Sequence, residues 1–383
     1  MSAKTFVVIG VLLAGAAAWL QHEWWRGTFN AAERPFVAWL SANDSLHTAG
    51  LPPLAIVLFD DEAAKLAGTD GLGMLDGALF ARAASKLGAA AAGVVSLPGD
   101  PRRMLEAARG LRVFAGYPEN EAPGEGWTPL AGEPAAGWPE IRGLTAKKHG
   151  VSPRGFLSPP AAKAGPMRIQ IVARSGENTV PSFLVLAWAS AQSLRTDAIT
   201  VSADSVIGPR GALGIDHSGG GWFYPEAPRV ITMNELLVAS ERFEREGGTS
   251  PFKGFLLVLA RATSDVMRVS GEGRAPATSV EMWGSSWEAV RHGQMFLLPG
   301  WWFVPAVALA GTLLARFASL RTRRAGIFAM IFGLMFFLLL SLGLFSGARV
   351  SLPLVPSVIT MMLGLFAGWT SRALGGTSSP RKP

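Results

Sequence analysis

Residues 54–62 read LAIVLFDDE, an unbroken apolar run that ends at three acidic side chains. A short, partly β-branched apolar run of this kind is typical of a strand that is buried on both faces of a parallel sheet. Apolar residues at helical spacing follow over 75–87, and residues 90–97 predict a second buried strand. A strand, a helix and a parallel strand form a right-handed crossover unit. The sequence therefore predicts an α/β fold with a mainly parallel sheet.

The alternation of strands and helices continues through the centre of the chain. Apolar runs predict further strands at 113–116 and 255–260, and Gly-rich turns flank hairpin strands predicted at 206–215 and 221–224. Residues 118–143 are dense in Pro, Gly, Glu and Ala, a composition that predicts a long surface loop. Further helices are predicted at 181–195 (with Ser182 as N-cap), 233–243 and 280–292.

Four apolar runs near the two ends of the chain have the character of membrane-spanning segments. Hydrophobic residues make up 49% of the chain and charged residues only 16%, which is unusual for a soluble domain. The last three runs are long enough to cross a bilayer, and Trp24 and Trp25 extend the first as interfacial anchors. A cleavable signal peptide is the alternative for the first run, because residues 16–18 are all alanine. The runs cover residues 5–20, 296–320, 325–347 and 351–369.

The basic residues beside these runs indicate their orientation, because cytoplasmic flanks carry an excess of Lys and Arg. Lys4, the cluster at 321–324 and the tail from Arg372 should all be cytoplasmic, so four crossings place residues 21–295 outside. We predict a multi-pass protein of a bacterial inner membrane with both termini in the cytoplasm. Its predicted domains are an N-terminal transmembrane anchor (1–26), an extracytoplasmic α/β domain (27–294), a bundle of three transmembrane helices (295–371) and a cytoplasmic tail (372–383).

Charge and cysteine content exclude several classes of function. The chain has no cysteine, so it contains no disulfide, no thiolate nucleophile and no cysteine-built metal centre. Its formal charge is +7, but several basic residues flank the apolar runs and the middle of the chain mixes both signs. A nucleic-acid surface needs basic residues clustered on one face. We therefore expect the lipid bilayer, and no nucleic acid, as a partner.

Asp60, Asp61 and Glu62 are the first candidate ligand-binding residues. They follow a predicted buried strand, and ligands of open α/β sheets bind outside the carboxyl ends of the strands. The alternative is that Asp60 or Asp61 caps the helix that follows. The second candidate is Arg154, which would bind an anion; the alternative there is a solvated basic loop that includes residues 147–149.

No compact catalytic motif accompanies these residues. Asp216 and His217 precede a glycine run at 219–221, a pattern that favours a hairpin turn over acid–base chemistry. The chain contains no Gly-x-Ser-x-Gly elbow and no phosphate-binding P-loop. We therefore predict that the protein is not an enzyme and needs neither a cofactor nor a metal.

The order of the predicted elements resembles that of the CHASE2 sensor proteins of bacterial membranes, over about residues 5–371. Residues 56–62, IVLFDDE, are similar to the family's opening strand and its acidic end. HGVSPR at 149–154 resembles the family's Asp-Gly-Val-x-x-Arg stretch, and VPSFL at 180–184 resembles the helix start that follows it. The resemblance implies an extracytoplasmic sensory domain between one N-terminal and three C-terminal helices. Three positions depart from the family pattern: Ser96, His149 and Ser279.

The resemblance implies a sensor that acts through another protein. CHASE2 proteins usually continue into a cytoplasmic kinase or cyclase, whereas this chain stops about a dozen residues after its last apolar run. We expect it to recognise a small-molecule ligand or an envelope protein and to signal through a membrane partner. Small residues such as Gly333 and Gly343 would allow close helix contacts with that partner or with a second copy of the chain. The alternatives are a structural scaffold of an envelope complex, and an envelope hydrolase that uses Asp60 or Asp61.

Overall fold

The chain divides into two compact units in a computed structural model. One unit comprises Met1–His47 and Phe296–Pro383, and the other comprises Thr48–Met295. We call them the helical unit and the α/β unit and describe each by itself. The structure describes residues 3–44, 50–59, 74–95, 102–119, 126–145, 153–158, 166–261, 279–298, 306, 310, 313–314, 317–318 and 321–375.

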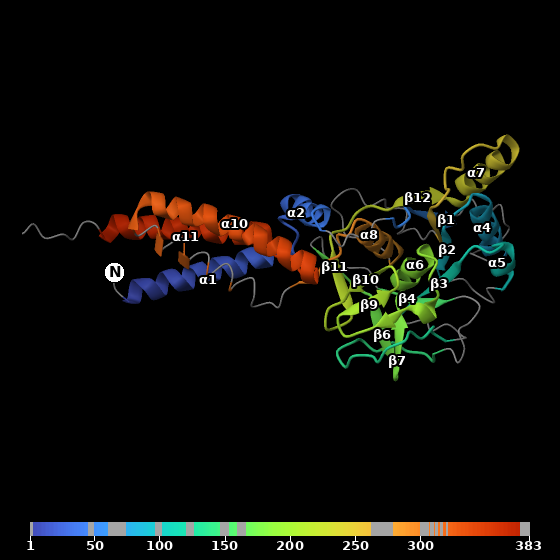
Figure 1. Cartoon of the computed structure of the whole chain (residues 1–383), viewed down its shortest axis with the longest axis horizontal. Coiled ribbons are helices and arrows are strands. Elements are labelled where there is room, and N and C mark those ends of the chain that lie inside the picture. Colours follow the sequence, from blue (N-terminus) through green and yellow to red (C-terminus); the bar gives the residue numbers. More distant parts are fainter. Residues whose placement is uncertain are drawn as a thin grey trace, which may run out of the picture. The chain divides into compact units, whose positions relative to one another are not determined.

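The described part of the α/β unit contains a six-stranded sheet in which every neighbouring pair of strands is parallel (Figure 1). The strand order is β12-β1-β13-β2-β3-β4. The predicted α/β fold with a parallel sheet is confirmed, although the sequence did not predict β4 or β12. The strands are β1 (Leu54–Phe59), β2 (Ala91–Val95), β3 (Val113–Pro118), β4 (Arg154–Leu157), β12 (Arg229–Thr232) and β13 (Leu256–Arg261).

Alternate residues of β1 face opposite apolar cores, as the two-residue period of a strand requires. Ala55 and Val57 belong to one core, and Ile56 and Leu58 belong to the other. Both faces of the sheet are covered by helices, which explains the unbroken apolar runs of β1 and β13. One face packs against α4 (Met74–Lys86), α5 (Arg102–Ala107) and α7 (Met233–Glu246), and the other against α6 (Phe183–Ala191) and α8 (Ser279–Arg291) (Figure 1).

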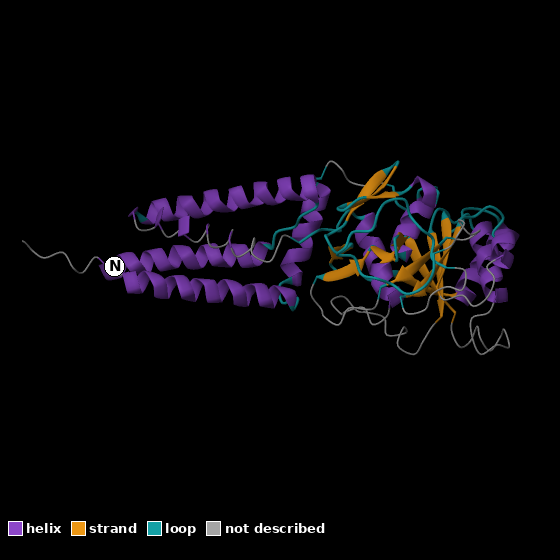
Figure 2. Cartoon of the chain, turned by 90° about the horizontal axis from the view of Figure 1, so that it is seen from below, coloured by secondary structure: helices purple, strands orange, loops and turns teal. Residues whose placement is uncertain are grey.

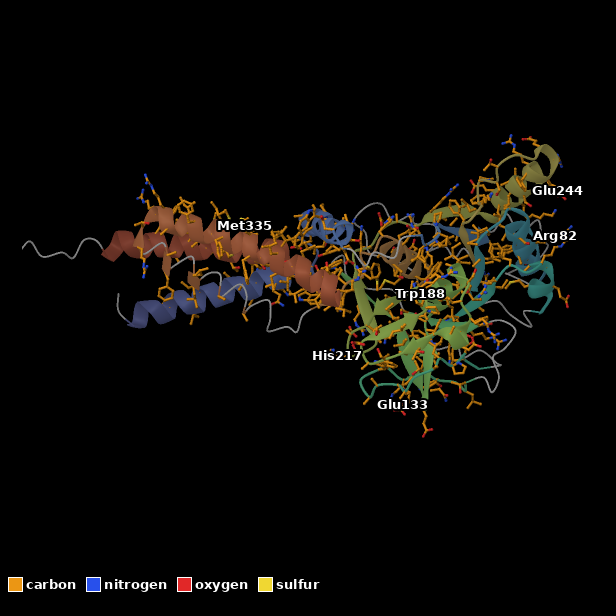
Figure 3. All side chains as sticks on the ribbon, in the orientation of Figure 1. Arg82, Glu133, Trp188, His217, Glu244 and Met335 are labelled. Atoms are coloured by element: carbon orange, nitrogen blue, oxygen red, sulfur yellow. The ribbon has the colours of Figure 1, made fainter. Side chains whose placement is uncertain are left out.

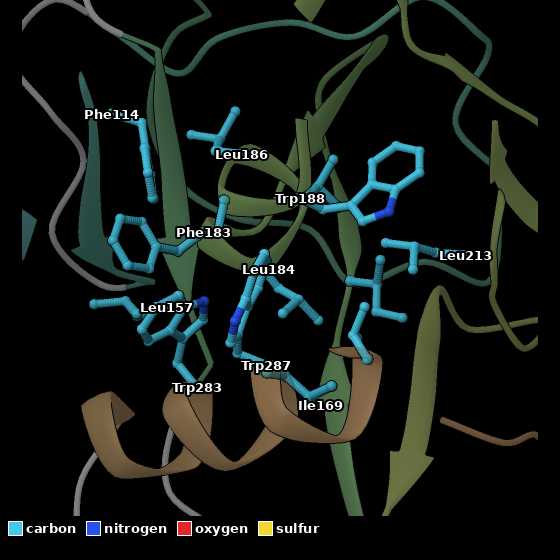
Figure 4. Close-up of a cluster of buried hydrophobic side chains, with 14 of the residues drawn as sticks. Phe114, Leu157, Ile169, Phe183, Leu184, Leu186, Trp188, Leu213, Trp283 and Trp287 are labelled. Carbon is cyan, nitrogen blue, oxygen red and sulfur yellow. The ribbon is translucent and has the colours of Figure 1, made fainter. Parts of the chain in front are cut away.

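A stripe of glycines lets α6 approach the sheet closely. Gly93 of β2 and Gly116 of β3 lie against the ring of Phe183, and a Cβ atom added at Gly116 would come within 2.6 Å of that ring. Phe183 also packs against Phe114 and Trp283, with ring centroids 4.8 and 4.9 Å apart (Figure 4). All residues of α6 except the last are buried, so the helix that the sequence predicts at 181–195 lies inside the unit.

Residues 126–145 form no helix or strand, as the sequence predicts, and much of the segment is exposed, but parts of it are buried in the unit. Trp127 and Trp138 have exposed fractions of only 0% and 2%. The backbone N–H of Leu130 donates to the carbonyl of Thr179 at 2.9 Å, which ties this segment to a strand. The frequent Pro and Gly residues fit the irregular backbone, and the two buried tryptophans explain why the segment packs onto the unit.

Small antiparallel sheets complete the described part of the α/β unit. The sequence predicted the strands β9, β10 and β11, and the structure confirms them, but the other four in these sheets were not predicted. The pairs are β5 (Met167–Gln170) with β11 (Gly220–Phe223), β6 (Val172–Ser175) with β7 (Asn178–Pro181), and β9 (Ser205–Gly208) with both β8 (Thr200–Val201) and β10 (Gly211–Gly214).

The helical unit contains a short helix that the sequence analysis did not predict, α2 (Asn30–Ala42), beside longer ones (Figure 2). It contacts α10 and α11, and α1 contacts α11. Residues 27–47 therefore group with the helices, although the sequence placed the start of the extracytoplasmic domain at residue 27. Most of the apolar run predicted at 296–320 lies outside the described residues. The longer helices are α1 (Ala3–Trp25), α10 (Arg323–Ala348) and α11 (Leu354–Gly375).

Among the described residues, α10 is the one helix that is long and apolar enough to cross a membrane, with a mean hydropathy of 2.6 over its most apolar window. A shorter apolar helix, Leu354–Thr370, lies within α11. Large apolar side chains of α10 form an exposed stripe at intervals of one and three residues (Figure 3 labels Met335 within it). The stripe consists of Ile327, Phe328, Ile331, Phe332, Met335, Phe336 and Leu339.

Candidate functional site

Two neighbouring strands of the sheet are followed by helices on opposite faces. β1 is followed along the chain by α4, in the layer with α5 and α7, whereas β13 is followed by α8, in the layer with α6. In open α/β sheets a ligand crevice forms outside the carboxyl ends of strands at such a switch point. The carboxyl ends of β1 and β13 are therefore the candidate site for ligand recognition.

Phe59 and Arg261 are the last residues of these two strands and are partners in the register of the sheet. Arg261 is exposed, whereas the whole of β1 is buried. The predicted acidic residues begin directly after Phe59 in the chain. Phe59 itself lies beside Arg261, which carries the guanidinium. Asp60, Asp61 and Glu62 themselves lie outside the described residues.

Arg261 is the described charged group at these two strand ends, and it suits an anionic ligand group. The guanidinium of Arg261 is a donor of fixed geometry that suits a carboxylate or a phosphate. In the part of the chain that the structure describes, no group of three or more His, Asp or Glu side chains could hold a metal ion. A ligand that meets both Arg261 and the acidic run would carry groups of both charges.

Arg154, the second predicted ligand residue, lies on β4, the outermost strand on the side of the sheet away from β12. It begins β4 and has an exposed fraction of 4%, so Arg154 itself is not part of a solvated loop, whereas residues 147–149 lie outside the described residues. Its backbone N–H donates to Thr128 Oγ1 at 2.8 Å. The sheet order puts four strand spacings, about 19 Å, between β1 and β4. Arg154 and the carboxyl end of β1 therefore belong to different sites.

Glu119 is a functional candidate that sequence reasoning missed. It directly follows β3, at the same edge of the sheet as the ends of β1 and β13. Burial raises the pKa of its carboxyl group above the ordinary value. Groups with perturbed pKa values are enriched at functional sites. Its position after a predicted strand is a signal that could have found it, because the carboxyl ends of parallel strands share one edge.

Asp216 and His217 belong to a structural turn. The Asp216 carboxylate pairs with the guanidinium of Arg168 at 3.0 Å and accepts from the backbone N–H groups of Ser218 and Gly220 at 2.9 and 3.0 Å. Burial alone would raise the pKa of Asp216, but the bonds to Arg168, Gly220 and Ser218 hold it below its ordinary value. His217 is exposed (Figure 3). This is the arrangement of a structural turn between β10 and β11, which pair with other strands and form no hairpin, and not of a catalytic pair.

Comparison with known proteins finds no matching family model, no matching curated protein and no matching solved structure. The resemblance to CHASE2 proteins therefore stays a prediction from the sequence. Two observations bear on function: the switch point at the carboxyl ends of β1 and β13, and the exposed apolar stripe of α10.

Proposed function

We propose that this chain is a membrane sensor that carries its α/β unit outside the cytoplasm and recognises a small polar ligand there. The observation that carries this proposal is the switch point between β1 and β13, where Arg261 is exposed beside the strand that leads into the acidic run at 60–62. The resemblance of residues 56–62 to the opening strand of CHASE2 sensors supports the same site. Recognition without turnover is the simplest use of such a site in a chain without a compact catalytic motif.

The exposed stripe of α10 supports the membrane part of the proposal. An apolar surface made of seven large exposed side chains is unfavourable in water, but it is the normal exterior of a helix in hydrocarbon. We propose four crossings, by residues 5–20, 296–320, 325–347 and 351–369, with both termini in the cytoplasm. The clusters of Arg beside these runs then lie on the cytoplasmic side, and the α/β unit lies outside.

The absence of cysteine makes this topology directly testable by thiol labelling, because the natural chain gives no background. Glu177→Cys places a thiol on an exposed turn of the α/β unit, and Thr322→Cys places one at the exposed N-cap of α10. In intact spheroplasts a membrane-impermeant maleimide should label Glu177→Cys and spare Thr322→Cys. Permeabilised membranes should then show both variants labelled. If Thr322→Cys reacts in intact spheroplasts, the proposed topology is wrong.

We further propose that the response reaches the cell through a partner protein. Purification of the full-length chain in mild detergent, followed by mass spectrometry, should recover a membrane or cytoplasmic protein that carries a kinase or cyclase. An unrelated multi-pass protein with the same tag is the control. If only envelope proteins are recovered, at fixed ratio and without any effect of ligand, the chain is a scaffold instead. A hydrolytic turnover that Asp60→Ala abolishes would replace both proposals with an enzyme.

A further inference from the structure

Two carboxylates, one from α2 and one from just after it, hold the turn between α10 and α11. The Glu33 side chain accepts hydrogen bonds from the backbone N–H groups of Leu354 (3.1 Å) and Val355 (2.8 Å) at the start of α11. Asp44 forms an ion pair with Arg349, the C-cap residue of α10. We call the contact between Glu33 and the start of α11 the α2 latch.

The start of α11 makes Glu33 an important acceptor. The first N–H groups of a helix have no acceptor within the helix, and the positive end of the helix dipole favours a carboxylate beside them. Pro356 has no N–H, so the first turn at 354–357 offers three donors, and Glu33 accepts from two of them. The latch therefore provides an acceptor for two of the three N–H groups that have none within the helix.

Burial opposes the charge on this carboxylate. Glu33 has an exposed fraction of 1% and shares its face of α2 with the buried side chains Phe36 and Val37. Burial raises the pKa of Glu33 from its ordinary value of 4.5 to about 7, while the N–H groups of Val355 and Leu354 act in the opposite direction. The carboxyl group of the latch therefore changes its charge close to neutral pH.

The other charged groups around the latch do not account for this shift. Glu23 and Arg26, at the end of α1, pair with each other at 3.5 Å, and Asp44 pairs with Arg349. None of these charges is among the causes that shift the pKa of Glu33. The remaining charged or titratable residues of α1, α2, α10 and α11 are Lys4, His22, Arg34, Arg323, Arg324 and Arg372.

We propose that Glu33 is a proton-sensitive latch, which holds α2 against the start of α11 at acidic pH and loosens as the pH rises. A protonated Glu33 is neutral, so it stays buried at little cost while its carbonyl oxygen still accepts an N–H. An ionised Glu33 must either remain buried with two backbone donors or move into water. The inference adds external pH as a stimulus to the proposed sensor, although the titration of the latch does not depend on that function.

The direction of the effect follows from proton linkage. Glu33 binds its proton more tightly in the closed latch than in water, so protons stabilise the closed state. The closed state is most stable below pH 4.5, loses stability as the pH rises towards about 7, and changes no further above that. Over this interval the ratio of closed to open latch should fall on the order of a hundredfold.

Amide hydrogen exchange at Leu354 and Val355 reports on the latch directly, because their N–H groups are its donors. We expect the protection of this peptide in the detergent-solubilised full chain to fall on the order of a hundredfold between about pH 5 and about pH 8, after correction for intrinsic exchange. Glu33→Gln is uncharged at both values, so its protection should not change. Glu23→Gln, which removes a carboxylate of α1, should keep the dependence of the natural chain.

Two results would overturn the latch. One is protection at Leu354 and Val355 that is the same at both pH values in the natural chain, and the other is an equal pH dependence in Glu33→Gln. The first measurement needs no substitution, so it decides the question even when Glu33→Gln does not fold. A failure of the proposed topology would leave both results unaffected, because exchange is measured on the purified protein.

Discussion

Asp44→Ala should destabilise the helical unit by about 3 kcal/mol, because it leaves the guanidinium of Arg349 largely buried without its carboxylate. The Asp44 side chain has an exposed fraction of 0%, and its Oδ2 atom lies 2.6 Å from Nη1 of Arg349. Arg349 also has a left-handed φ of 55° at the end of α10, a conformation that is costly for a residue with a side chain. The ion pair therefore stabilises a strained turn. Its loss should leave the Arg349 charge unpaired and also allow the turn to leave its left-handed conformation.

Denaturant unfolding of the purified protein in detergent, followed by tryptophan fluorescence, measures this loss. The double variant Asp44→Leu/Arg349→Met should recover most of the stability, since it removes both charges from the buried site. Glu241→Ala is the matched control, because it breaks an exposed pair with Arg245 on α7 and should cost less than about 1 kcal/mol. If Asp44→Ala costs no more than Glu241→Ala, the buried pair does not stabilise the unit.

The centre of the sheet was predictable from the sequence because its strands are buried on both faces. β1 and β13 are apolar over nearly their whole length, which is the composition of strands buried on both faces of a parallel sheet. The edge strands could not be predicted in the same way. β12 is only four residues long and half exposed, so its strand conformation depends on pairing with β1. β4 contains an arginine and a glycine, and it is a strand because it pairs with β3.

The candidate site was predictable only in part, for a topological reason. An acidic run after a buried strand is visible in the sequence, and Asp60 to Glu62 were predicted on that basis. The sequence does not reveal that β13 lies between β1 and β2, and this order is what brings Arg261 beside the end of β1. Arg154 shows the converse, since a basic residue in a basic stretch proved to be buried at the other edge of the sheet.

The helix α2 was not predicted because its charged residues are typical of the surface of a soluble domain. Glu33 is buried, and its hydrogen-bond donors come from the start of α11, more than 300 residues later in the chain. Pro35 lies inside the helix, which also weakened the helical pattern. Contacts between segments this far apart in the sequence cannot be found from local periodicity.

Gly116→Ala and Phe183→Ala should each destabilise the α/β unit, yet each should reduce the cost of the other. Phe183→Ala leaves a cavity among Phe114, Trp283 and the glycine stripe and should cost about 3–5 kcal/mol. Gly116→Ala places a Cβ atom within 2.6 Å of the Phe183 ring and should cost about 1–3 kcal/mol. In the double variant the new methyl group occupies space that the ring has left, so the total should fall below the sum by about 1 kcal/mol or more.

Gly155→Ala provides the matched control for this cycle, because its clash is of a different kind. A Cβ atom added at Gly155 would meet the backbone of Pro181 and Ser182 at 2.8 Å, and removal of the Phe183 ring does not relieve that contact. Gly155→Ala and Phe183→Ala should therefore add to within about 0.5 kcal/mol. Urea unfolding of the three single and two double variants distinguishes the cases. If the Gly116 pair is as additive as the Gly155 pair, the close approach of α6 does not depend on the missing side chain of Gly116.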